Sequence, residues 1–213
     1  MSKLTPEAAA TNTRLDEMDD RPRGRGRPRA TSPATISELA FALMRERGYS
    51  ATTMADIAAE AGISTPTLFR YFDSKAAVLW FGMDDSARLF RSAFAAIDAE
   101  VPLVDAVFAA YLEMLRASAE RLPLIKARIA VVERDPDAGA ATWGRYEEWG
   151  RMVSEFVAER RGIDPSSLEA TVLGNMIWAA LQTAISSWAV SVDDDPSTVV
   201  NSARALLREQ ILG

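Results

Sequence analysis

The 213-residue sequence contains no cysteine and no histidine. Without cysteine the chain has no disulfides, no thiol nucleophile and no thiolate metal site. Because histidine is missing as well, Ser-His-Asp catalysis, Cys-His catalysis and histidine-bound zinc are excluded. These absences argue against an enzyme, and we expect neither a cofactor nor a bound metal.

Long apolar runs are also missing. No segment approaches the roughly 18 consecutive apolar residues of a membrane-spanning helix, and the first thirty residues hold no apolar stretch suited to a signal peptide. Hydrophobic residues nevertheless make up 48% of the chain, which is enough to fill the core of one large domain or two small ones. We expect a soluble, cytoplasmic protein that does not bind membranes.

Two remaining features could suggest an enzyme, but neither fits one. The glycines of "RGRGRP" (residues 23–28) lack the preceding strand and the following Lys-Ser/Thr of a phosphate-binding loop. Asp193, Asp194 and Asp195 precede Pro196, and such a run is more typical of a solvated connection between helices than of a metal site. The sequence therefore offers no catalytic residues.

Charge is distributed unevenly along the chain, whose formal net charge is −6. Residues 21–80 carry nine basic and five acidic side chains, whereas residues 81–213 carry 13 basic and 20 acidic ones. Five of the nine basic side chains are arginines at alternate positions of "RPRGRGRPR" (residues 21–29). This asymmetry predicts a polyanionic partner for the N-terminal part alone.

Capping signals predict three helices after the arginine-rich segment. Ser32 before a proline and Gly48 after the last apolar residue predict a helix over residues 33–47. In "TMADIAAEAG", Thr53 is followed three residues later by an aspartate, a near capping box that opens a second, short helix. Ser64 opens a third helix in "STPTLFRYF".

The last two of these helices are joined by a tight "AGIS" turn, which is the pattern of a helix-turn-helix unit. In the third helix Leu68 and Phe72 would face inward, leaving a polar outer surface suited to base edges and phosphates. That outer surface consists of Thr65, Thr67, Arg70 and Tyr71. Spacing alone equally fits a small helical bundle with no partner.

Residues 36–79, "ISELAFALMRERGYSATTMADIAAEAGISTPTLFRYFDSKAAVL", resemble the DNA-binding domain of the tetracycline-repressor (TetR) family of bacterial transcription regulators. The resemblance implies that the third helix enters the major groove, and that Thr53 and Lys75 bind phosphates. The "LFRYF" run and Trp80 are similar to an actinobacterial subgroup with regulators associated with mycofactocin. The motifs that carry the family resemblance are Gly48-Tyr49, Thr52-Thr53, Ile57-Ala58, Ala61-Gly62-Ile63-Ser64, Thr67-Leu68-Phe69, Tyr71-Phe72 and Ser74-Lys75.

Three positions of the third helix depart from the family pattern. The family often has a basic residue in place of Thr65, a small residue in place of Pro66 and a tyrosine in place of Phe69. Because a phenylalanine cannot donate a hydrogen bond to phosphate, Arg70 or Tyr71 would replace that contact.

Residues 1–31 are rich in Thr, Pro, Gly, Arg and Asp, so we expect an unstructured arm. An arginine-rich arm ahead of a helix-turn-helix resembles arms that lie in the adjacent minor groove, where a narrow groove concentrates negative potential. The alternative is a solvated tail that serves solubility. The expected DNA-binding residues are Arg21, Arg23, Arg25, Arg27, Arg29, Thr53, Ser64, Thr65, Thr67, Arg70, Tyr71 and Lys75.

Proline placement divides the rest of the chain into further helices. We expect them over residues 74–97, 102–119, 123–134, 136–161, 165–191 and 196–211. The helix over 165–191 has scarcely any polar face, so it must be covered all round. A homodimer paired through the last two helices explains this cover, and a two-fold dimer also suits a DNA site with two half-sites.

Aromatic and methionine side chains are plentiful between residues 80 and 178, and they suit a cavity for an apolar small-molecule effector. Polar residues on apolar helix faces would orient that ligand. The alternative is that the aromatics are core and that the polar groups satisfy local backbone or subunit contacts. The expected ligand-binding residues are Phe90, Phe94, Arg128, Trp143, Tyr146, Asn175, Trp178 and Gln182.

These observations predict an all-α protein with an arm (1–31), a three-helix DNA-binding domain (32–79) and a larger helical effector-binding and dimerisation domain (80–213). We expect a sequence-specific repressor that binds a palindromic double-stranded DNA operator as a dimer and is released by an apolar small molecule. One alternative is a non-specific architectural DNA-binding protein. The other is a helical interaction module without a DNA role.

Overall fold

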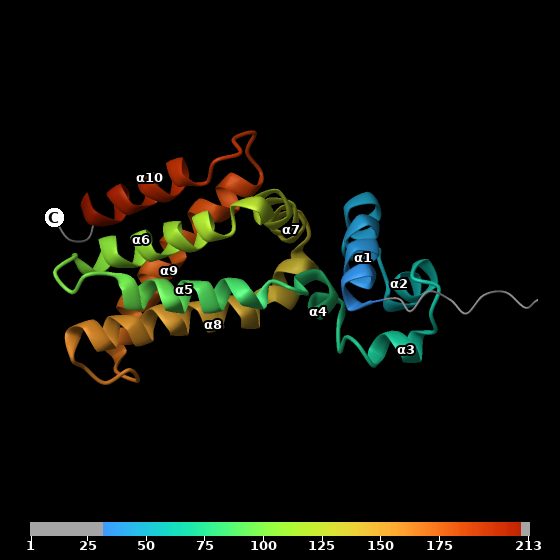
Figure 1. The fold of residues 1–213 in the computed structure, drawn as a ribbon, viewed down its shortest axis with the longest axis horizontal. Helices are drawn as coiled ribbons and strands as arrows, with labels where there is room; N and C mark the ends of the chain where they lie inside the picture. Colours follow the sequence, from blue (N-terminus) through green and yellow to red (C-terminus); the bar gives the residue numbers. More distant parts are fainter. Residues whose placement is uncertain (1–31, 210–213) are drawn as a thin grey trace, which may run out of the picture. The chain divides into compact units, whose positions relative to one another are not determined.

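The computed structural model describes residues 32–209, and every regular element in that range is helical. The expected all-α class is confirmed (Figure 1). The described residues belong to one compact unit. Its helices are α1 (Pro33–Arg47), α2 (Met54–Glu60), α3 (Thr65–Phe69), α4 (Lys75–Trp80), α5 (Asp84–Ala96), α6 (Leu103–Ala117), a 3-10 turn (Ala119–Arg121), α7 (Leu122–Arg134), α8 (Pro136–Arg161), α9 (Leu168–Ala189) and α10 (Ser197–Leu207).

The first four helices each begin at a hydroxyl residue, as the sequence predicts for three of them. Ser32, Thr53, Ser64 and Ser74 each accept a hydrogen bond from a backbone N–H in the first turn of the helix that follows. Such caps satisfy N–H groups that have no partner within the helix. The short helices α2, α3 and α4 are therefore fixed largely by their caps and by the core they share.

That core is built from the inward faces of α1, α2 and α3. Ile36, Ile57 and Leu68 are fully buried in it. Val131 from α7 and Ala138 from α8 complete the same cluster, so the N-terminal helices pack on two helices of the following region. The predicted boundary near residue 79 thus lies within one continuous hydrophobic cluster.

The prediction of a single helix over residues 74–97 is wrong. It is divided into α4 and α5, and the chain between them passes through Gly82 with φ of +75°. A side chain disfavours this left-handed backbone conformation, whereas glycine adopts it freely. The glycine in "WFGMDD" thus ends one helix instead of lying inside a longer one.

The other helices follow the predicted segments within a few residues. The predicted spans 33–47 and 136–161 match α1 and α8 at both ends. In contrast, α9 and α10 are shorter than the predicted spans 165–191 and 196–211, the second of which extends beyond the described residues. Every helix in the described range is too short or too polar to cross a membrane.

The second region is the part of the structure from α5 onward. Most of its helices run alongside one another (Figure 1), namely α5, α6, α8, α9 and α10. The helices α8 and α9 approach each other closely at one glycine. A side chain at Gly174 of α9 would place its Cβ only 2.5 and 2.6 Å from the Cα and N atoms of Ser154 in α8. The missing side chain therefore allows the two helices to pack with their backbones in near contact.

Candidate nucleic-acid interface and internal cavity

The helix α3 presents most of its side chains to solvent. Leu68 is fully buried, and Phe72 just beyond the helix is also buried, as the sequence predicts for its inward face. Thr65 and Thr67 are half-buried, while Arg70 and Tyr71 are exposed. All four predicted outward-facing side chains thus retain access to solvent on one short segment.

The predicted hydroxyl contacts are already engaged within the protein. The Thr53 hydroxyl donates to Asp56 Oδ2 at 2.6 Å, and the Asp56 N–H donates back to Thr53 Oγ1 at 3.1 Å. The Ser64 and Thr67 hydroxyl oxygens lie 2.8 Å apart. These pairs hold the N-termini of α2 and α3 in place, so each hydroxyl has a structural role beside any contact to DNA.

Lys75 has a structural role too. Its ammonium group donates to the backbone oxygens of Tyr49, at 2.5 Å, and Thr52, at 2.8 Å, and lies 4.0 Å from the centre of the Tyr49 ring. Burial lowers the pKa of Lys75, and the carboxylates of Asp135 and Asp137 oppose that shift only in part. An ammonium has three donors, so one remains for an external anion.

The sequence analysis missed one feature of this surface. Phe69 at the end of α3 is 49% exposed, as much as Tyr71 at 48%, whose exposure the sequence predicts. The signal was present, because Leu68 and Phe72 lie four positions apart on the inward face and place Phe69 off it. The five predicted arginines of the arm, Arg21 to Arg29, lie outside the described residues.

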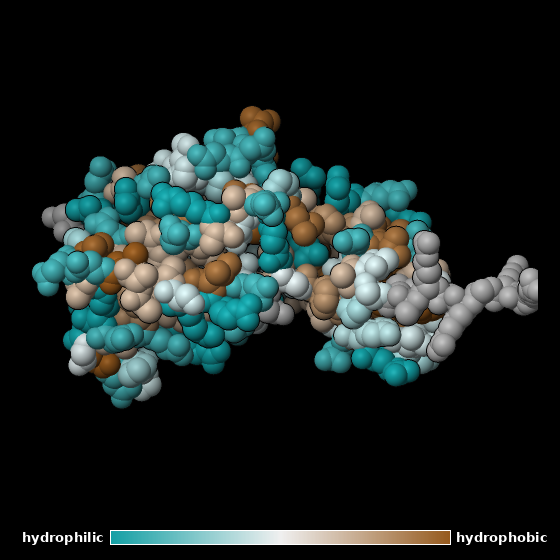
Figure 2. Space-filling view, in the orientation of Figure 1, coloured by the Kyte–Doolittle hydropathy of each residue, from teal (hydrophilic) through white to brown (hydrophobic). Residues whose placement is uncertain are grey.

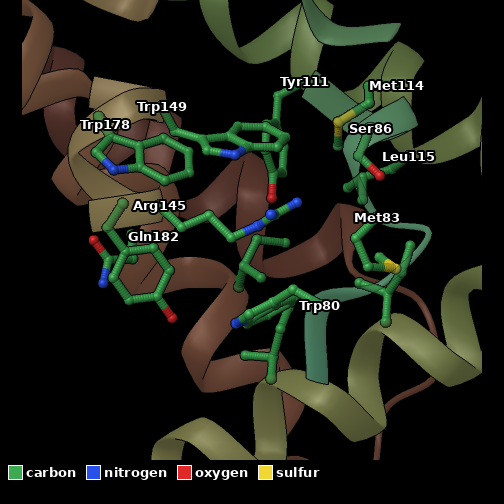
Figure 3. Close-up of a pocket in the computed structure, with 14 residues that line it drawn as sticks. Trp80, Met83, Ser86, Tyr111, Met114, Leu115, Arg145, Trp149, Trp178 and Gln182 are labelled. Atoms are coloured by element: carbon green, nitrogen blue, oxygen red, sulfur yellow. The ribbon is translucent and has the colours of Figure 1, made fainter. Parts of the chain in front are cut away.

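An apolar cavity of about 80 Å³ lies among the helices that follow (Figure 3). Three of the eight predicted ligand-binding residues line it: Tyr146, Trp178 and Gln182. The remaining lining side chains are Trp80, Met83, Ser86, Tyr111, Met114, Leu115, Ile125, Ile129, Arg145, Trp149 and Ile185.

Aromatic rings form one wall of this cavity. Trp149 and Trp178 stack with ring centres 5.4 Å apart, and Tyr111 meets both edge-on. In Figure 3 the Tyr111 hydroxyl points into the space beside the Arg145 guanidinium group. Burial raises the pKa of Tyr111 and raises that of Tyr146 to about 12, so both phenols remain neutral hydrogen-bonding groups.

The other five predicted ligand residues do not line the cavity. Phe90 is fully buried behind its wall, stacked on Trp149. Phe94 stacks on Phe156 at a separate surface crevice. Trp143 is 61% exposed and donates from Nε1 to Glu147, because its position places it on the outer face of α8.

Asn175 and Arg128 also lie elsewhere. Asn175 is exposed on α9, next to Gly150 of α8. The sequence places it seven residues before Gln182, but seven residues is slightly less than two helical turns and other helices cover the two positions differently. Arg128 is only 3% exposed, within the packing between the two regions.

Arg128 connects α7 to the N-terminal helices. Its Nη1 donates to the Phe81 carbonyl at 2.8 Å, and its Nη2 donates to the Ser37 hydroxyl at 3.1 Å. Ser37 in turn donates to the Val78 carbonyl at 2.8 Å. Burial lowers the pKa of Arg128 to about 10, which leaves it protonated at neutral pH.

The end of α4 and the turn that leads to α5 border both the cavity and the N-terminal helices. Trp80 and Met83 line the cavity. Trp80 Nε1 also donates to the Thr142 hydroxyl at 3.1 Å, and Arg121 donates to the Gly82 carbonyl. A change in cavity shape would therefore act directly on the residues that follow the helix-turn-helix.

The outer surfaces of α9 and α10 are rich in small and apolar side chains. Ala179, Thr183 and Ser187 are exposed on α9 and line an open groove against α10. Leu206 on α10 borders the same groove and is 60% exposed. Val190 and Val192 are exposed in the connection between the two helices, where Figure 2 shows a brown patch.

This combination of a capped helix-turn-helix with an all-helical, cavity-bearing second region defines a class of DNA-binding transcription regulators. Two family models match the chain. Residues 36–79 match the bacterial regulatory proteins of the tetR family, and residues 101–211 match the MftR C-terminal domain. The chain belongs to the TetR family and is a transcriptional regulator, not an enzyme.

Relatives extend this result. A protein of Mycobacterium tuberculosis named for the regulation of mycofactocin biosynthesis, MftR, is 31% identical over 164 residues, covering 76% of this chain and 82% of the relative. The expected likeness to that subgroup is confirmed.

Solved structures support the fold. Thermus thermophilus FadR, a repressor crystallised with lauroyl-CoA, matches with a TM-score of 0.55 at 21% identity, covering 85% of this chain and 96% of its own. FadR from Bacillus halodurans, a fatty acid degradation regulator, also has a TM-score of 0.55, at 16% identity over 84% and 95% of the two chains.

Proposed function

We propose that this regulator is a repressor that binds a palindromic DNA operator as a homodimer and is released by an apolar small molecule. The observation that carries the proposal is the position of Trp80 and Met83, which line the cavity and directly follow the DNA-binding helices. A ligand in the cavity would therefore meet the segment that positions α3.

In the proposed complex α3 enters the major groove. Thr65, Thr67, Arg70 and Tyr71 would contact bases and phosphates, because they retain exposed surface on one segment. Thr53, Ser64 and Lys75 would hold phosphates near the starts of α2, α3 and α4. The arginines at 21–29 would follow the adjacent minor groove.

Dimerisation would use the outer faces of α9 and α10. Exposed Ala179, Thr183 and Ser187 form a stripe at four-residue spacing, with Leu206 beside it. Small side chains let a second copy approach closely, and a two-fold pair would present two α3 helices to two half-sites.

The size of the cavity supports a mechanical coupling. A volume of about 80 Å³ is well below the several hundred Å³ that usually hold a drug-sized ligand. A larger effector must therefore displace lining side chains, including Trp80 and Met83. That displacement would change the hydrogen bonds that Trp80 donates to Thr142 and that Arg128 donates to the Phe81 carbonyl, and so the spacing of the two α3 helices.

The first test is selection of DNA from random duplexes by the full-length chain. A palindromic consensus is expected, whereas an architectural protein would enrich no sequence and an interaction module would retain no DNA. Deleting residues 1–30 should flatten the salt dependence of binding, because each lost phosphate contact lowers the log–log slope by about 0.9. An unchanged slope would contradict the role of the arm.

The second test concerns the effector. Fatty acids, acyl thioesters and aromatic compounds are screened by thermal shift, and those that bind are titrated against the operator complex. The expected result is a fivefold to 150-fold loss of operator affinity, corresponding to a coupling of about 1–3 kcal/mol, and operator should weaken the ligand by the same factor. Ligands that stabilise the protein but leave operator affinity unchanged would show that the cavity is not a switch.

A further inference from the structure

Three side chains that line the internal cavity carry hydrogen-bond donors without a partner in residues 32–209. Tyr111 is only 6% exposed, and its hydroxyl points into the cavity without an internal hydrogen bond (Figure 3). Ser86 Oγ and Trp178 Nε1 are buried and also lack a partner. Since folded proteins satisfy nearly all of their buried polar groups, these donors point to a ligand that accepts hydrogen bonds.

The cavity is poorly suited to a charged ligand. Of the described residues that line it, none is an aspartate or glutamate, so a cationic ligand would find no carboxylate. The charged lining residue is Arg145, whose guanidinium group lies over the Trp80 ring, 5.2 Å from its centre. Burial raises the pKa of Tyr111, and that of Tyr146 to about 12, and the same burial disfavours a ligand carboxylate. An uncharged acceptor such as a carbonyl oxygen therefore fits this site.

The walls of the cavity favour a flat ligand. The rings of Trp149 and Trp178 are stacked with an angle of 23° between their planes, and a flat ring can pack against such a surface by offset stacking. The volume is about 80 Å³. An apolar cavity of about 150 Å³ takes up a benzene ring, so a single ring fits here after small displacements, whereas a long alkyl chain would displace many side chains.

We propose that the effector is an uncharged aromatic carbonyl compound, whose ring packs against Trp149 and Trp178 and whose carbonyl oxygen accepts a hydrogen bond from the Tyr111 hydroxyl. This inference rests on the proposed function, in which the cavity takes up the effector. It assigns a chemical class to that effector and makes Tyr111 the residue that selects it.

The test compares acetophenone with α-methylstyrene, in which a C=CH₂ group replaces the C=O group at nearly the same shape. Binding of each to the full-length chain is measured by isothermal titration calorimetry. Tyr111→Phe should weaken acetophenone about fivefold, as the loss of one neutral hydrogen bond typically does, and should not weaken α-methylstyrene. Comparing the two ligands in both proteins isolates the hydrogen bond from the greater hydrophobicity of α-methylstyrene.

The substitution at Tyr111 has a matched control. Tyr49→Phe also removes the hydroxyl of a buried tyrosine, but Tyr49 belongs to the hydrophobic cluster of the N-terminal helices. It should leave the affinity for both ligands unchanged. Because the Tyr111 hydroxyl has no internal hydrogen bond to lose, Tyr111→Phe should unfold at the same urea concentration as the unaltered protein or at a higher one.

Two further probes test the charge of the ligand. Benzoate replaces the methyl group of acetophenone by a charged oxygen, and benzylamine carries an ammonium group. Both should bind the unaltered protein more weakly than acetophenone. Tighter binding of benzoate would show that the site takes an anion, and tighter binding of benzylamine that it takes a cation; either result would overturn the inference.

The other outcomes separate this inference from the proposed function. If Tyr111→Phe weakens neither ligand, or both equally, or if acetophenone does not bind, the contact with Tyr111 is wrong, while a purely apolar effector would still satisfy the proposed function. If acetophenone binds through Tyr111 but leaves operator affinity unchanged, the carbonyl contact stands and the proposed release by a cavity ligand fails.

Discussion

The two regions of this regulator place their aromatic side chains in opposite ways. On α3, Phe69 and Tyr71 are about half exposed. In the second region Phe90, Trp149 and Trp178 form a buried stack behind and along a cavity. A ring that is left in water is free to contact an external surface, whereas stacked rings define the shape of an internal space.

The difference has a basis in helix length and packing. The five-residue helix α3 buries Leu68 and has little further area to cover its other side chains. In contrast, α8 and α9 are 26 and 22 residues long and pack with their backbones in near contact at Gly174. A change in the first region should therefore alter DNA binding, and a change between the long helices should alter stability.

The largest effect is expected from Gly174→Ala. The new Cβ would meet backbone atoms of Ser154, which cannot rotate away as a flexible side chain could. Forcing the two helices apart should lower the free energy of unfolding by about 3 kcal/mol, as overpacking typically does. Urea unfolding of the full-length chain measures it.

Gly144→Ala is the matched control for this substitution. Gly144 also lies within a long helix, α8, but beyond the adjoining residues and backbone of that helix no atom lies within 4 Å of the position that its Cβ would take. Because alanine favours helix over glycine, this variant should be more stable by about 0.5–1 kcal/mol. Equal effects of the two substitutions would show that the close contact of α8 and α9 does not limit stability.

The next largest effect is expected from Arg128→Met, which tests whether the two regions depend on each other. The substitution keeps much of the apolar side chain and removes the hydrogen bonds to Phe81 and Ser37. Hydrogen bonds from charged groups contribute about 1.5–3 kcal/mol, and relief of the desolvation of Arg128 offsets part of this. We expect the free energy of unfolding to fall by about 2 kcal/mol.

Arg128→Met should also reduce the loss of operator affinity that a ligand causes, and by more than its lower stability explains. Operator titrations with and without a ligand of the cavity measure that response. Trp143→Ala changes a residue of α8 that is 61% exposed and should leave both quantities nearly unchanged. If Arg128→Met keeps the full response to effector, the hydrogen bonds of Arg128 to Phe81 and Ser37 do not transmit the effect of the ligand to the DNA-binding helices.

A smaller effect is expected from single changes on α3. Thr65→Ala should reduce affinity for the selected operator by about 1–2 kcal/mol and leave affinity for random DNA almost unchanged, because base contacts carry the sequence preference. Lys75→Gln should weaken binding to both DNAs and also lower stability, since the ammonium donates to two backbone carbonyls. Fluorescence anisotropy with the two duplexes distinguishes these patterns, and identical patterns for both variants would contradict the assigned roles.

Much of the fold follows from local signals that act within a few residues. Ser32, Thr53 and Ser64 are correctly identified as caps because a cap depends only on the turn that follows it. The division at Gly82 was missed because apolar residues continue on both sides of this glycine, so the pattern predicts one long helix, and only the structure shows the φ of +75° that ends α4.

The sequence predicts the residues of the candidate sites less well than it predicts the helices. Tyr146, Trp178 and Gln182 line the cavity, but an apolar helix position can equally face the core, a crevice or solvent, as Phe90, Phe94 and Trp143 do. Arg128 looked like a ligand contact because it lies on an apolar face. Its partners Phe81 and Ser37 are 47 and 91 residues away, a pairing that only the tertiary structure brings together.

The smallest effect is expected from pH, at the contact between the α1–α2 turn and the start of α8. Ser50 donates from its N–H and its hydroxyl to Asp135, at 2.7 and 2.6 Å. Partial burial raises the pKa of Asp135, but these hydrogen bonds, with those from the N–H groups of Asp137 and Ala138, outweigh it and hold the pKa below its usual value.

A carboxyl group whose pKa is lowered by folding stabilises the folded state above its unfolded pKa, which is near 4, and loses that contribution as the pH falls through the folded pKa. Stability should therefore decline on acidification below about pH 5. Ser50→Ala removes the side-chain hydrogen bond and should make that decline shallower, as followed by urea midpoints between about pH 3 and 7. Ser191→Ala is the control, because that hydroxyl donates to the Trp188 carbonyl instead of a carboxylate, and its acid dependence should match the unaltered protein. If Ser50→Ala shows the unaltered dependence as well, the contact at Asp135 contributes nothing to the acid sensitivity of the fold.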